Sequence, residues 1–147
     1  MDELQKIPSF TKDHNTLMPG LHEGNMYYGV TTWDLRFKKP NAGDFIDQAA
    51  LHSIEHMLAT LLRNHKYGNS VVYFGPMGCR TGFYLLTVNM GGARVKRMLL
   101  DCFTAALELT EVPGAKKEEC GNYLEHDLDG AKAECKKYLE ILNTKLN

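Results

Sequence analysis

Hydrophobic and polar residues alternate between positions 30 and 37, where Trp33, Leu35 and Phe37 would share one face. A period of two residues predicts a half-buried strand. Two further segments, residues 71–74 and 83–90, are rich in residues that favour strands and flank a loop with three glycines and a proline. We expect these two segments to pair as antiparallel strands.

Three other segments, residues 47–64, 94–109 and 128–146, show apolar positions with a helical period. Strands and helices that follow one another without regular βαβ alternation predict an α+β fold, with an antiparallel β-sheet and helices packed mainly on one face. No repeat, low-complexity segment or linker divides the chain. Residues 1–147 are therefore expected to form a single compact domain.

The composition narrows the class of protein. The chain has 17 basic and 18 acidic side chains, a formal net charge of −1, and no run of Lys and Arg, which argues against a nucleic-acid partner. No apolar run approaches the roughly 20 residues that span a bilayer, and the N-terminal residues do not resemble a secretory signal. We therefore expect a cytoplasmic protein without a membrane partner.

The cysteines fall into two groups. In a reducing cytoplasm we expect them not to form disulfides. Cys102 and Cys135 occupy apolar positions of predicted helices, as core residues do. Cys79 instead lies between Gly78 and Arg80 in the glycine-rich loop. This setting suits either a turn residue or a thiol with a chemical role.

The segment His52-Ser-Ile-Glu-His56 lies within the first predicted helix. Residues four apart on a helix lie on the same side, one turn apart, so both imidazoles could bind one ion. The order H-x-x-E-H also occurs in inverzincin metallopeptidases. The alternative interpretation is an amphipathic helix that exposes two histidines and a glutamate to solvent.

A catalytic metal site commonly has three protein ligands, whereas a purely structural site is usually closed by four. Cys120, which precedes a glycine, is the third ligand that we expect. Glu118 or Glu119 is the competing choice, and would complete a peptidase-like site in which Glu55 activates water. Three further histidines are expected to be structural or surface residues: His22, His65 and His126.

Taken together, the motifs resemble those of the S-ribosylhomocysteine lyase (LuxS) family, in family order from about residue 7 to residue 142. The matching segments are Phe10 with Asp13-His14-Asn15, Asp34-Leu-Arg36-Phe37 with Pro40-Asn41, His52-Ser-Ile-Glu-His56, Gly75-Pro-Met-Gly-Cys-Arg-Thr-Gly82 with Tyr84-Leu85, and Cys120-Gly121 leading to His126-Asp-Leu128.

The resemblance implies a lyase of the activated methyl cycle. It would cleave S-ribosylhomocysteine to homocysteine and 4,5-dihydroxy-2,3-pentanedione, the precursor of the quorum-sensing signal autoinducer-2, by carbonyl migration and β-elimination of the thioether. The implied metal is Fe²⁺, with Zn²⁺ or Co²⁺ as substitutes. The implied roles are metal binding by His52, His56 and Cys120, acid–base catalysis by Glu55 and Cys79, and substrate binding by Arg36, His14 and Ser9.

The resemblance further implies a homodimer whose sites lie at the subunit interface, with the segment that carries His14 reaching the site of the partner. Without it, Arg36 would be interpreted as a solvated strand residue and His14 as an ordinary loop histidine. The chain also departs from the family pattern. An acidic residue, Ile and Ser often precede Pro-Met-Gly-Cys in the family, whereas this chain has Tyr73-Phe74-Gly75, so a substrate contact is expected to differ.

Overall fold

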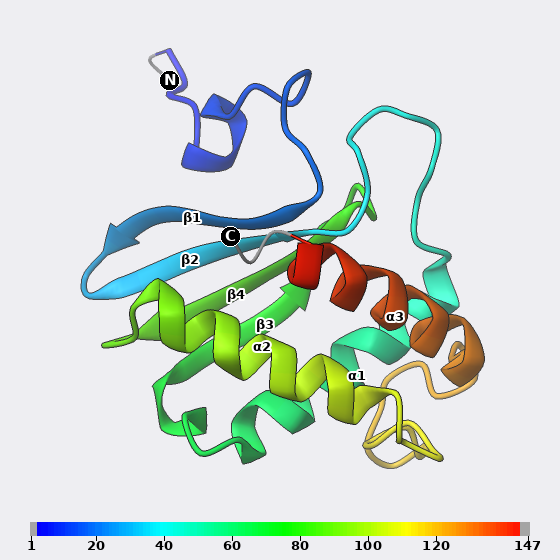
Figure 1. Ribbon diagram of the computed structural model, residues 1–147. Coiled ribbons are helices and arrows are strands. Elements are labelled where there is room, and N and C mark those ends of the chain that lie inside the picture. Colours follow the sequence, from blue (N-terminus) through cyan, green and yellow to red (C-terminus); the bar gives the residue numbers. More distant parts are fainter. Residues whose placement is uncertain (1–2, 145–147) are drawn as a thin grey trace.

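The computed structural model describes residues 3–144, in which one antiparallel sheet is covered by helices on one face (Figure 1). The strands are β1 (Gly20–Tyr27), β2 (Val30–Arg36), β3 (Val71–Pro76) and β4 (Gly82–Val88), in the order β1-β2-β4-β3. The helices are α1 (Gln48–Asn64), α2 (Gly92–Ala106) and α3 (Leu128–Thr144), with short 3-10 turns at Pro8–Thr11 and Gly68–Ser70. The predicted α+β architecture is confirmed.

Strand β1 is not evident from the pattern of hydrophobic residues in the sequence. It is an edge strand whose residues are mostly half-buried or exposed, and its register shifts between Glu23 and Met26. It therefore lacks the regular alternation of a strand with one buried face. A two-residue turn of Tyr28 and Gly29 joins it to β2, and both residues have positive φ, as a type I′ hairpin turn requires.

The hydrophobic core lies between the sheet and the helices. The alternating residues of the second strand behave as predicted, because Trp33 and Leu35 are buried in this core. Beyond the end of β2, the ring of Phe37 stacks on Tyr138 of α3, with 4.2 Å between ring centroids. The apolar stripe predicted for the first helix also enters the core: Leu51, Ile54, Leu58 and Leu62 are buried and Leu61 is partly buried.

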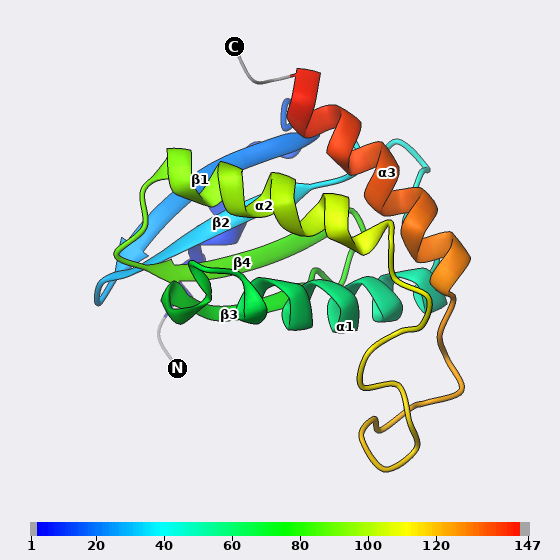
Figure 2. The ribbon, with the colours of Figure 1, turned by 60° about the horizontal axis from the view of Figure 1, so that its bottom comes forward.

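The N-terminal segment lies on the opposite side of the sheet from the helices (Figures 1 and 2). It covers part of the face that carries Asp34, whose carboxylate accepts a hydrogen bond from Lys12 at 2.7 Å. None of the helices within residues 3–144 combines the length and apolarity that a bilayer crossing needs.

The loop between α2 and α3 positions the residues that precede the last helix. Asp127 caps α3, since its Oδ1 accepts a hydrogen bond from the N–H of Gly130 at 2.9 Å. The N–H of Asp127 donates to Oγ of Ser53 on α1 at 2.9 Å, which ties the end of the loop to that helix. The end predicted for this helix, residue 146, lies outside the described residues.

Candidate metal centre

Helix α1 presents His52 and His56 on one side, as their spacing predicts. Both residues are half-buried, and their rings meet edge to face with 4.8 Å between centroids and an interplanar angle of 80°. Ser53 and Ile54, which follow His52, are fully buried and hold this part of the helix against the rest of the molecule. The two imidazoles therefore project from a fixed backbone.

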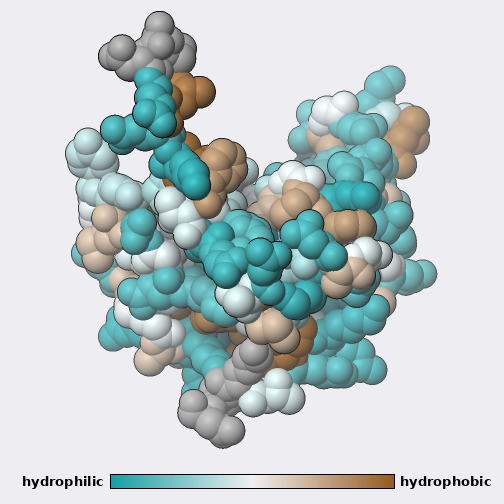
Figure 3. Space-filling model, turned by 90° about the horizontal axis from the view of Figure 1, so that it is seen from above, coloured by the Kyte–Doolittle hydropathy of each residue, from teal (hydrophilic) through white to brown (hydrophobic). Residues whose placement is uncertain are grey.

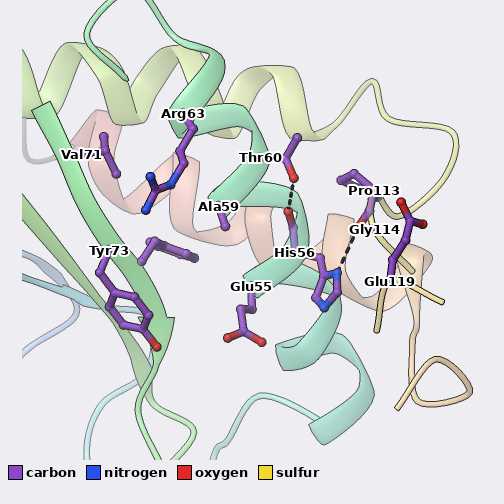
Figure 4. Close-up of a pocket in the computed structure, with 11 residues that line it drawn as sticks. Glu55, His56, Ala59, Thr60, Arg63, Val71, Tyr73, Pro113, Gly114 and Glu119 are labelled. Carbon is purple, nitrogen blue, oxygen red and sulfur yellow. Dashed lines mark hydrogen bonds between the residues drawn. The ribbon is translucent and has the colours of Figure 1, made fainter. Parts of the chain in front are cut away.

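Backbone carbonyls fix the orientation of both rings. Nδ1 of His52 lies 2.7 Å from the carbonyl oxygen of Glu125. Nδ1 of His56 lies 3.0 Å from the carbonyl oxygen of Pro113, the contact drawn in Figure 4. A carbonyl oxygen can only accept, so each Nδ1 carries the proton and donates it. Each Nε2 consequently has a free lone pair, the tautomer that suits a metal ligand.

The loop between α2 and α3 brings Cys120 to these two nitrogens. Its Sγ lies 3.5 Å from Nε2 of His52 and 3.8 Å from Nε2 of His56. Gly114 lets the loop pass close to the helix: it has a φ of +68°, and a Cβ there would lie 3.3 Å from Nδ1 of His56. The three ligands expected from the sequence are thus close together.

A fourth side chain, His126, lies in the same group, where the sequence predicts only a structural or surface residue. Its Nε2 lies 3.7 Å from Sγ of Cys120, and the four candidate ligand atoms lie within 4.8 Å of one another. Burial lowers the pKa of His126, and the nearby His52 and His56 lower it further. The one sequence feature that could have indicated this proximity is the position of His126 six residues after Cys120 and directly before Asp127, which caps α3.

The peptidase-like ligand set does not form. Glu118 and Glu119 are exposed and lie outside the group of four. Oε1 of Glu119 instead accepts a hydrogen bond from the N–H of Lys116 at 3.3 Å. The candidate ligand atoms are imidazole nitrogens and one cysteine sulfur, with no carboxylate oxygen. Such nitrogen and sulfur ligands suit iron, cobalt or zinc better than magnesium or calcium. The group could therefore hold such an ion.

Glu55 lies on the same helix and lines a cavity of about 420 Å³ beside His56. Figure 4 shows the carboxylate of Glu55 and the hydroxyl of Tyr73 pointing into this space from α1 and β3. The cavity also carries Arg63, whose Nη2 donates to the carbonyl of Val72 at 2.9 Å. A carboxylate that can accept and release protons is thus adjacent to the candidate ligands.

Arg36 is fully buried, so the interpretation of Arg36 as a solvated residue is wrong. Its guanidinium forms a bidentate pair with Asp34, at 3.1 Å to Oδ1 and 2.6 Å to Oδ2. Nη1 of Arg36 donates to the hydroxyl of Thr81 at 2.8 Å and lies 4.0 Å from Sγ of Cys79. The same hydroxyl lies 3.1 Å from that sulfur. Cys79 is exposed in its loop, beside a cation and a hydroxyl.

The structure does not bring Ser9 or His14 to the candidate ligands of the same chain. Ser9 lines a second cavity, of about 650 Å³, together with residues of the sheet face that the N-terminal segment covers. Nδ1 of His14 lies 2.9 Å from the carbonyl of Lys12. Neither side chain belongs to the ligand group or lines the cavity of Glu55.

The other two cysteines are structural, as predicted. All four cysteines are free, and Cys102 and Cys135 are buried in the core. Burial raises the pKa of each of these thiols to about 12, with smaller contributions from Asp101 and Glu134 respectively. They are therefore poor nucleophiles, in contrast to the exposed thiol of Cys79.

Fold and site together define an α+β domain with a nitrogen and sulfur metal-binding group next to a carboxylate-bearing cavity. A family model described as S-ribosylhomocysteinase (LuxS) matches residues 7–147. The chain belongs to this family.

Individual relatives agree with this assignment. An S-ribosylhomocysteine lyase of Borreliella afzelii (strain PKo) is 47% identical over 150 residues, covering 95% of this chain and 94% of the relative. One from Phocaeicola vulgatus is 44% identical, with 95% and 91% covered, and one from Clostridium beijerinckii is 41% identical, with 92% and 90% covered.

Proposed function

We propose that the protein is a metal-dependent lyase that cleaves S-ribosylhomocysteine to homocysteine and 4,5-dihydroxy-2,3-pentanedione, the precursor of autoinducer-2. One observation carries the proposal. In a chain of this family, Nε2 of His52, Nε2 of His56 and Sγ of Cys120 converge beside the cavity of Glu55.

His52, His56 and Cys120 would hold one Fe²⁺ per subunit, with Zn²⁺ or Co²⁺ as substitutes. Two neutral imidazoles and a thiolate leave a net charge of +1 on a divalent ion, which when bound would act as a Lewis acid towards the substrate carbonyl. The Irving–Williams order favours zinc over ferrous iron at such a site, so purified protein is expected to carry zinc unless iron is protected from exchange.

Cys79 and Glu55 would move the protons of the reaction. The thiolate of Cys79 would take a proton from the carbon next to the carbonyl, and the guanidinium of Arg36 and the hydroxyl of Thr81 lie close enough to stabilise its negative charge. The carboxylate of Glu55 would carry protons between the substrate oxygens. Two such shifts move the carbonyl along the ribose chain towards the thioether.

Elimination then completes the reaction. Once the carbonyl is two carbons away from the sulfur-bearing carbon, the carbon between them carries an acidified proton. The thiolate of Cys79 would take that proton, its electron pair would form a C–C double bond as the C–S bond breaks, and Glu55 would deliver a proton to the departing homocysteine sulfur. Arg36, His14 and Ser9 would bind the substrate during these steps.

A homodimer would bring Ser9 and His14 into the mechanism. In one chain these residues lie on the sheet side away from the helices, on a segment with several exposed apolar side chains: Leu4, Ile7, Phe10 and Met18. Figure 3 shows brown side chains on the projecting arm next to the grey N-terminal residues. Burying them against a second copy would place His14 in the partner's site. The free cysteines suit the reducing cytoplasm, where we place the enzyme.

Mixed dimers test this arrangement. The variants His14→Ala and Cys79→Ala should each be inactive alone, and subunit exchange between them should restore part of the activity, because one site of the mixed dimer then has both intact side chains. No recovery in demonstrably mixed dimers would contradict a shared site.

The direct test of the function is to incubate cobalt- or iron-loaded protein with S-ribosylhomocysteine and to measure free homocysteine with a thiol reagent. Metal-free protein is the control. We expect homocysteine release only from the loaded enzyme. A fully loaded protein that releases none would refute the proposal and favour a site in which the ion only stabilises the fold.

A further inference from the structure

His126 could take part in the metal centre in two ways, as a fourth ligand or as a hydrogen-bond donor to a ligand. The choice matters because four protein ligands would close a tetrahedral site, whereas three leave a position for substrate. Two independent observations, the orientation of its ring and the hydrogen bonds of Ser53, decide between these roles.

The first observation is that His126 stacks on His52. Their ring centroids lie 4.0 Å apart and their planes differ by 23°, whereas the ring of His56 stands at about 80° to both. An imidazole binds an ion through a lone pair in its ring plane, at about 2.0–2.1 Å. Two stacked, nearly parallel rings direct their lone pairs side by side, so an ion cannot lie in both planes. In this arrangement His52 and His126 cannot both be ligands with good geometry.

The second observation is the hydrogen bonding of Ser53, which is fully buried. Its Oγ accepts the N–H of Asp127 at 2.9 Å and lies 2.9 Å from Nδ1 of His126. Among residues 3–144, Nδ1 of His126 is the hydrogen-bond acceptor available to the Ser53 hydroxyl proton. If Nδ1 carried a proton instead, the buried hydroxyl would be left without an acceptor, which costs about 1–3 kcal/mol.

The surroundings thus give His126 a different tautomer from the one that His52 and His56 share. His52 and His56 face carbonyl oxygens, so their protons lie on Nδ1 and their Nε2 atoms are free to bind an ion. His126 faces a hydroxyl donor, so its proton lies on Nε2, the atom that faces Sγ of Cys120 at 3.7 Å. A protonated nitrogen has no lone pair to offer a metal.

We propose that His126 is a positioning residue that donates an Nε2–H hydrogen bond to the sulfur of Cys120, with Ser53 fixing its tautomer. The inference rests on the metal centre of the proposed function. The N–H of Asn122 lies 3.5 Å from the same sulfur and is a second donor. Two N–H donors hold the thiolate in place and draw electron density from it, while the fourth coordination position stays open.

The tautomer can be measured directly. Long-range ¹H–¹⁵N spectra of the ¹⁵N-labelled, zinc-loaded full chain distinguish histidines protonated on Nδ1 from those protonated on Nε2, and the variant His126→Gln assigns the His126 signals. We expect an unligated, Nε2-protonated His126, together with Nδ1-protonated, metal-bound His52 and His56. A metal-bound Nε2 on His126 would overturn the inference.

Cobalt-loaded variants give a second readout. In His126→Ala, the sulfur-to-cobalt charge-transfer band should move to longer wavelength, and cobalt affinity should fall by about 10–100-fold, as for loss of an outer-shell partner. His126→Gln, whose amide can donate to the sulfur, should restore much of the band position. His52→Ala is the control for loss of a ligand. If His126→Ala lost as much cobalt affinity as His52→Ala and its d–d bands changed, His126 would be a ligand and the proposed role would be contradicted.

These outcomes separate the inference from the proposed function. A protein that binds zinc with the expected tautomers but releases no homocysteine would refute the lyase function and leave the role of His126 intact. An active enzyme in which Nε2 of His126 binds the metal would refute the proposed role of His126 and leave the lyase function intact. A protein that binds no zinc would overturn both.

Discussion

The group around Cys120 and the cluster around Arg36 are both polar, but they differ in burial and in charge. The side chains of the ligand group are half-buried, and backbone carbonyls or a hydroxyl hold the outer nitrogens of its rings. Arg36 and Asp34 are completely buried, and the carboxylate of Asp34 is the counter-ion of both Arg36 and Lys12. The first cluster is thus arranged to bind an ion, whereas the second forms most of its hydrogen bonds within the protein and places a guanidinium beside the sulfur of Cys79.

The largest expected effects separate the two sulfurs. Cys79→Ala should retain the fold and stoichiometric metal but lose about 10²–10⁴-fold or more in turnover, since it removes the proposed carbon base. Cys120→Ala should lose turnover because bound metal falls towards zero. Metal analysis and homocysteine release on the same samples check both predictions.

Either of two outcomes would break this contrast. Substantial lyase activity in Cys79→Ala would remove that thiol from the chemistry. Near-stoichiometric metal in Cys120→Ala would remove that sulfur from the ligands, and would direct attention to His126.

The sequence predicts only those members of the ligand group that residue spacing or the usual number of metal ligands can indicate. His52 and His56 followed from helical geometry, and Cys120 from the need for a third ligand. His126 did not, because it lies in a loop without periodicity and its approach depends on the contact between Ser53 and the cap of α3.

The fold shows the same limit. Segments with a buried stripe, such as α1 and β2, were predicted within a few residues. The edge strand β1 was missed because most of its side chains are not buried. Arg36 was misjudged for the opposite reason. Alternation places it on the outer face of β2, and only the three-dimensional structure shows that it is buried there, with Asp34 and Thr81 as hydrogen-bond partners.

The difference in burial predicts a difference in stability. Asp34→Asn preserves the shape of the side chain but leaves the buried charge of Arg36 without its counter-ion, which should cost about 3–5 kcal/mol of the free energy of unfolding. His52→Ala in metal-free protein should cost about 1 kcal/mol, the value of one hydrogen bond to a backbone carbonyl. Urea denaturation of both metal-free variants measures the contrast. Equal losses would show that the two clusters are not distinguished by burial.

The reactivity of the thiols should distinguish Cys79 from Cys120 without any mutation. In zinc-loaded enzyme, a brief treatment with iodoacetamide should modify Cys79, which is exposed, while the metal protects Cys120. Removing the metal should add Cys120 to the modified residues. Cys102 and Cys135 should stay unmodified in both states, because they are buried and burial raises the pKa of each thiol to about 12. Peptide mass spectrometry gives the result. Modification of Cys120 at the same rate with and without zinc would argue against its ligation.

The smallest expected effect concerns strand β3, which runs from the cavity of Glu55 to the loop of Cys79. This strand contains Tyr73-Phe74-Gly75, the segment that departs from the family pattern. Gly75 is buried, and a Cβ at this position would overlap the phenol ring of Tyr73, which lies across it. The two residues therefore form a matched pair: the glycine leaves the space that the tyrosine ring occupies beside the cavity.

Gly75→Ala should displace the ring of Tyr73 and raise KM for S-ribosylhomocysteine a few-fold, with about 1 kcal/mol or less of destabilisation because the half-exposed ring can move into solvent. Tyr73→Ala removes the overlap, so adding Gly75→Ala to it should change KM and stability little. Steady-state kinetics and urea denaturation of the two single variants and the double variant complete the cycle. Strict additivity would show that the ring and the glycine act independently, and that the contact between them does not shape the cavity of Glu55.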